Sequence, residues 1–138
     1  MDHATLVAPI LTPEMIAAGE GLVRAIDHAG IPVSAALWLL PPNESDWKLV
    51  ISSPEITSKG PHAFYQKVDQ ILRKMGPTPL STNVVSAFPP AHRLLSLLRA
   101  ALKTSAGISN IRFTQNVING VLIPDAHIYR LLPLSNAA

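Results

Sequence analysis

The chain has 138 residues, the usual size of one domain, and 48% of them are apolar, enough to bury a hydrophobic core. Only 14% of the residues are charged, against roughly 25% in an average soluble domain. Cysteine is absent, which excludes disulfides, thiolate catalysis and cysteine-based metal centres.

The few charges are unevenly distributed along the chain. Residues 1–69 contain four basic and eight acidic residues, whereas residues 70–138 contain seven basic residues and a single acid, Asp125. A chain polarised in this way favours contact between oppositely charged surfaces or attraction of a polyanion to the basic half. Because so few charges cover the surface, we expect a homo-oligomer or a subunit of a protein complex.

The N-terminal 30 residues predict an arm followed by a helix. Residues 1–11 are expected to form a loose arm or an added edge strand. They lack the basic start of a signal peptide, and no window of the chain reaches the roughly 20 apolar residues of a membrane span. We therefore expect a cytoplasmic protein with no membrane contact. Thr12 is suited to cap a helix over residues 13–29. Gly19 and Gly21 within it are interpreted as surface glycines, with close packing against a partner as the alternative.

The next segment predicts a hairpin. Residues 33–40 are almost entirely apolar, as in a central strand that is covered on both faces. Residues 47–52 alternate in polarity and are expected to pair with them, and residues 54–59 are expected to form a polar connection. In hydrophobic pattern, residues 24–52 resemble the first helix and hairpin of small sensor domains such as the GAF group. The later elements are spaced differently, so the resemblance implies no function here.

Two further helices are predicted in the second half of the chain. Apolar residues recur at helical spacing over residues 61–75, before Gly76-Pro77. A short strand is expected at residues 82–87, and a third helix is expected to start at Pro89-Pro90.

The C-terminal residues 108–132 predict a β-hairpin. Asn119-Gly120 is a strong two-residue turn signal, which would place Ile118 opposite Val121 and Asn116 opposite Ile123. Pro124-Asp125 is expected to break or bulge the second strand.

These elements together predict the fold class. Their order, α-β-β-α-β-α-β-β, indicates an α+β or α/β fold in which about three helices pack on a single mixed sheet. No internal repeat or linker divides the chain, so residues 1–138 are expected to form a single domain.

The third helix supplies the first candidate site. His92, Arg99 and Lys103 recur at helical spacing and are expected to share one exposed face. The residues that would bind a partner or a nucleic acid through this basic half are His92, Arg93, Arg99, Lys103 and Arg112. We favour a solvated face that pairs with the acidic half of the same or a neighbouring molecule. The chain has only seven aromatic residues with which to stack bases.

The predicted C-terminal hairpin supplies the second candidate site. Its register would place Asp125 and His127 on one face of the sheet, together with Arg112. A carboxylate that orients an imidazole is the support that a general base needs, and Tyr129 would extend the row. No nucleophile is identified, and polar residues alternating along a strand more often mark a face that contacts water.

The remaining signals are absences. The five histidines are scattered, no metal-ligand spacing occurs, and the usual nucleotide and hydrolase motifs are missing, so neither a metal nor a cofactor is expected. The resulting prediction is a non-enzymatic binding or scaffolding module that self-associates or joins a complex. The alternatives are polyanion binding through the basic half and a small enzyme or ligand-binding domain that uses Asp125 and His127.

Overall fold

Side-chain caps begin the first two helices of the computed structural model, which describes residues 10–40, 46–81, 83–118 and 120–133. The Thr12 hydroxyl accepts the backbone N–H of Met15 at 3.1 Å and begins α1 (Pro13–His28), as predicted. Ser53 accepts the N–H of Glu55 and begins α2 (Pro54–Lys59). The polar connection predicted for residues 54–59 is therefore wrong, because a capping serine before Pro54 favours a helical turn there.

The two later helices have different starts. Gly60, with φ +89°, leads directly into α3 (Pro61–Met75). The helix expected from Pro89-Pro90 begins at Arg93 instead and forms α4 (Arg93–Ala101). Its cap is His92, whose Nδ1 accepts the N–H of Leu94 at 3.1 Å.

Within the described residues, five strands form one mixed sheet with the order β3-β2-β1-β5-β4. The β2–β3 pair is parallel and the other pairs are antiparallel. With the four helices, the element order is α-β-β-α-α-β-α-β-β, which confirms the predicted α+β fold with one helix more than expected. The strands are β1 (Ala35–Leu40), β2 (Lys48–Ser52), β3 (Val85–Phe88), β4 (Ile111–Ile118) and β5 (Val121–Leu131).

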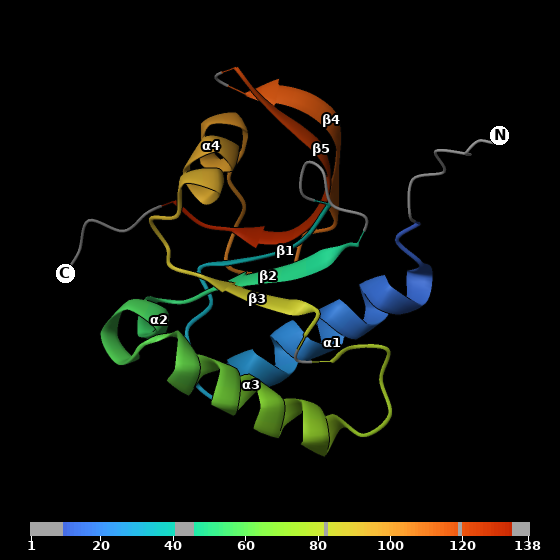
Figure 1. Cartoon of the computed structure of the whole chain (residues 1–138), viewed down its shortest axis with the longest axis vertical. Coiled ribbons are helices and arrows are strands. Elements are labelled where there is room, and N and C mark those ends of the chain that lie inside the picture. The colour runs from blue at the N-terminus through green and yellow to red at the C-terminus, as the bar shows by residue number, and fades with distance from the viewer. Residues whose placement is uncertain (1–9, 41–45, 82, 119, 134–138) are drawn as a thin grey trace, which may run out of the picture.

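Helices cover both faces of the sheet (Figure 1). Every residue of β1 is buried, which confirms that this strand is central and covered on both sides. Trp38 and Leu40 pack in the cluster that contains the apolar residues of α1 and α3. Leu37 and Leu39 pack on the opposite face with the leucines of α4.

The C-terminal hairpin has the predicted register, with Ile118 opposite Val121 and Asn116 opposite Ile123. The break predicted at Pro124-Asp125 is wrong, because the pairing of β4 with β5 continues without a shift through Asp125. The irregularity lies further along, where the register between β1 and β5 shifts at Tyr129. Such a bulge re-aims side chains.

Several predictions fall on residues outside the described ones. These are residues 1–9 of the arm predicted over residues 1–11, the loop at residues 41–45 and Asn119, the first residue of the predicted turn. Within the described ranges, no helix is long and apolar enough to cross a membrane.

Candidate functional site

The structure brings together part of the polar row predicted on β5. The rings of His127 and Tyr129 meet in an edge-to-face arrangement, with centroids 5.2 Å apart. His127 Nε2 lies 2.9 Å from Asn110 Oδ1, in the segment that precedes β4. Asp125, which is paired with Thr114 in the hairpin, contacts instead the diagonal neighbour Arg112 on β4, at 4.0 Å. The carboxylate therefore interacts with a guanidinium, while the imidazole has an amide as its partner.

The surroundings of His127 favour its neutral form. Only 8% of the residue is exposed, and this burial lowers its pKa. The positive charge of Arg112 lowers the pKa further, and the carboxylate of Glu20 opposes both effects. A neutral imidazole in contact with an asparagine is compatible with a structural role and with a role as a general base. This geometry therefore does not favour catalysis by His127.

Tyr129 is part of a buried clamp between the sheet and α1. Its hydroxyl donates to the carbonyl of Ile16 and accepts the indole N–H of Trp38 at 3.0 Å. Burial is the main cause that raises the pKa of Tyr129 to about 12, so the phenol stays protonated near neutral pH. The clamp needs Gly19, because a Cβ there would lie 2.6 Å from the Tyr129 hydroxyl. The interpretation of Gly19 as a surface glycine is therefore wrong.

The predicted basic face on α4 is divided by the structure. Arg93 and Lys103 are exposed, but Arg99 is 91% buried, since only 9% of it remains accessible. Its guanidinium donates to the carbonyls of Leu132 and Pro90, each at 2.7 Å. The expectation that Arg99 lies on an exposed face is wrong, because its guanidinium is buried where it donates hydrogen bonds to these two carbonyls. His92 is half-buried, and its ring stacks on Phe88 at a centroid distance of 3.9 Å.

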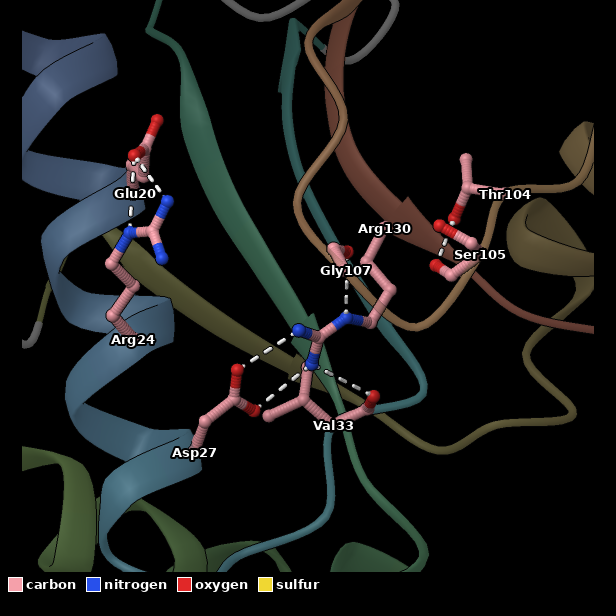
Figure 2. A network of polar contacts seen from close by, with 8 residues as sticks. All are labelled: Glu20, Arg24, Asp27, Val33, Thr104, Ser105, Gly107 and Arg130. Atoms are coloured by element: carbon pink, nitrogen blue, oxygen red, sulfur yellow. Dashed lines mark hydrogen bonds and ion pairs between the residues drawn. The ribbon is translucent and has the colours of Figure 1, made fainter.

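Other basic side chains of the second half bind acids of the same molecule. Arg130 pairs with Asp27 of α1 at 2.9 Å, as Figure 2 shows. Arg73 pairs with Asp69 at 2.9 Å, and Arg112 also lies 5.2 Å from the centre of the Trp47 ring. The charge polarity of the sequence is thus partly neutralised within the fold. Both ion pairs, and also the contact of Arg112 with Trp47, join residues 70–138 to residues 1–69.

The described residues contain shallow grooves but no cluster of histidines and carboxylates that could hold a metal ion. One groove, of about 400 Å³, lies beside Trp47 and is also lined by Met15, Lys48 and Asn83. Trp38 lies beneath it and is fully buried. Trp38 is therefore inaccessible to a partner from this groove.

The outer edge of β4, termed the β4 edge, is a further candidate that the sequence did not reveal. It runs over the eight residues from Ile111 to Ile118, and none of the labelled helices lies beyond it (Figure 1). Val117 is 62% exposed, one of two large apolar residues so exposed in the described part of the chain. The opposite edge strand, β3, has four residues and is followed at once by Pro89. β3 is therefore protected from further pairing by its short length and by the proline that follows it, and β4 has neither feature.

Comparisons with protein families, curated proteins and solved structures find no match to this chain. The assignment of a function therefore depends on the geometry described above.

Proposed function

We propose that this protein is a non-enzymatic binding module that extends its sheet with a strand of a partner at the β4 edge. The observation that carries this proposal is the contrast between the long outer strand β4 and the short, proline-ended β3. An edge strand presents backbone N–H and C=O groups in a row and is a ready template for another strand. Proline, lysine and β-bulges commonly protect such an edge from pairing. β4 contains neither proline nor lysine, and its pairing with β5 shows no register shift.

The hairpin register identifies the outward backbone groups. Ile118 and Val121 are paired with two residues between them, the spacing at which the two flanking residues exchange both of their backbone hydrogen bonds. In an antiparallel ladder the direction alternates with each residue. Phe113 and Gln115 therefore turn their N–H and C=O groups away from β5, towards a partner strand.

The other predicted functions have weaker support. Polyanion binding would depend chiefly on Lys74, Arg93 and Lys103, since Arg99, Arg112 and Arg130 are already engaged within the molecule. Catalysis by Asp125 and His127 would need a carboxylate–imidazole contact, whereas each of the two has another partner.

Two substitutions at one position test the proposal. Gln115→Pro removes the outward N–H and leaves the ladder to β5 intact, because proline is tolerated where its missing donor faces outward. Gln115→Ala keeps that N–H. Native mass spectrometry of the gently isolated full chain should show an associated mass for the wild type and Gln115→Ala, and the free chain for Gln115→Pro. An associated mass that survives Gln115→Pro would overturn the proposal, as would a wild type found only as the free chain.

A further inference from the structure

A strand that pairs with the β4 edge needs the same alternation of apolar and polar residues that β4 itself has. Ile111 and Phe113 pack in the cluster under α4, whereas Arg112 and Thr114 are on the other face of the strand. A strand that pairs with β4 must continue this alternation, since paired residues lie on the same face of a sheet. β4 itself has the required apolar and polar pattern.

We propose that two copies of this chain pair through their β4 strands, antiparallel and about a two-fold axis at Thr114, to form one ten-stranded sheet. This inference rests on the proposed function of the β4 edge and names its occupant. A symmetric pair is closed, since each copy uses its own β4 edge, and the outer edges of the joined sheet are the short, proline-ended β3 strands.

The alternation of faces limits where the axis can lie. Opposite residues share a face only if the axis passes through a residue, and Thr114 and Gln115 are the central residues of β4. With the axis at Thr114, Phe113 of each copy faces Gln115 of the other, so their outward groups exchange hydrogen bonds. Ile111 then faces Val117 of the second copy and covers a side chain that is 62% exposed in the single chain.

Charge distinguishes the two possible axes. Arg112 is the only charged residue of β4. With the axis at Thr114 it faces Asn116, whereas with the axis at Gln115 it faces Ile118, and an isoleucine would remove water from the guanidinium without offering an acceptor. In neither arrangement do like charges face each other across the pair.

A disulfide between introduced cysteines tests the position of this axis directly, because the chain has no cysteine of its own. With the axis at Thr114, the two Thr114 residues form a pair without backbone hydrogen bonds, with Cα atoms about 4.5 Å apart. That separation is within disulfide range. Under mild oxidation the purified Thr114→Cys variant should therefore form a covalent dimer. Gln115→Cys should not, and neither should Ser58→Cys, on the exposed surface of α2, which reports random collision.

The outcomes separate this inference from the proposed function. A purified wild type that sediments as a dimer, a Gln115→Pro variant that sediments as a monomer and a selective Thr114→Cys crosslink would support both. A crosslink of Gln115→Cys in place of Thr114→Cys would overturn the Thr114 axis. A monomeric purified chain whose isolated form carries a different protein, lost with Gln115→Pro, would overturn self-pairing and leave the strand-binding function standing. A dimer that persists in Gln115→Pro would overturn both.

Discussion

Arg130 and Asp27 join the sheet to α1 through two parallel hydrogen bonds, from Nη1 to Oδ1 at 3.0 Å and from Nη2 to Oδ2 at 2.9 Å (Figure 2). The Arg130 side chain is 6% exposed, and it also donates to the carbonyls of Val33 and Gly107. The two residues come from the oppositely charged halves of the sequence. Two opposite charges from the two halves are therefore paired inside the fold, and the proposed partner surface, the β4 edge, has Arg112 as its one charged residue.

Loss of this ion pair should destabilise the protein. Asp27→Asn leaves a buried guanidinium without its carboxylate and should lower the free energy of unfolding by about 2 kcal/mol. Glu20→Gln is the matched control, since Glu20 forms an exposed pair with Arg24 and the change should cost about 0.5 kcal/mol or less. Urea denaturation measures both, and equal effects would contradict the assigned role of Arg130.

The two glycines of α1 should respond to alanine in opposite directions. In Gly19→Ala the new Cβ would lie 2.6 Å from the Tyr129 hydroxyl and 2.7 Å from Trp38 Nε1, which should cost about 1–3 kcal/mol. In Gly21→Ala the nearest atom is the Met75 methyl at 3.6 Å, an ordinary contact. Helix propensity should then stabilise that variant by up to about 1 kcal/mol. Thermal unfolding of both variants checks the signs, and a neutral Gly19→Ala would argue against the clamp.

The Tyr129 phenol should make stability fall at alkaline pH. Its pKa is raised from 10.0 to about 12, so between these values the unfolded chain loses a proton that the folded chain keeps. Ionisation thus favours the unfolded state, and the free energy of unfolding should decrease as pH rises from 10 to 12. Tyr129→Phe should be less stable at neutral pH and should lack this slope. A slope retained by the variant would assign it to another group.

Arg99 and Lys103 should behave differently although both were predicted on one basic face. Arg99→Met removes buried hydrogen bonds to the carbonyls of Leu132 and Pro90 and should destabilise the fold by about 1–3 kcal/mol. Lys103→Met changes an exposed side chain and should alter stability by about 0.5 kcal/mol or less. Chemical denaturation distinguishes the two, and similar effects would contradict the inward position of Arg99.

Salt should have little effect on self-association. The proposed contact between copies consists of backbone hydrogen bonds and the Ile111–Val117 pair, and Arg112 is its only charged residue. Sedimentation at 0.05 M and 1 M sodium chloride should give similar dimer fractions. Dissociation at high salt would point to association of the oppositely charged surfaces instead.

Much of the fold was predictable because it depends on local chemistry. Thr12 as a helix cap, the Asn119-Gly120 turn and the apolar run of β1 each act within a few residues, and each gave a correct element or register. α2 was missed because its six residues show no apolar periodicity, although Ser53-Pro54 was a usable capping signal.

The candidate site was less predictable because it depends on long-range pairing. Nothing in residues 111–118 states that β4 lies at an edge, since strand order is a property of the whole sheet. The inward turn of Arg99 depends on a carbonyl 33 residues away, and the role of Gly19 depends on Tyr129. Spacing along one helix carries no information about such contacts.

Amide hydrogen exchange at Phe113 and Gln115 tests the strand-binding claim most directly, because these two N–H groups are the ones assigned to a partner strand. For the purified chain, the account predicts slow exchange at high protein concentration and faster exchange on dilution, with the amides of Arg112 and Thr114 protected throughout by β5. Fast exchange of Phe113 and Gln115 at every concentration, in a chain that nevertheless associates, would contradict the account.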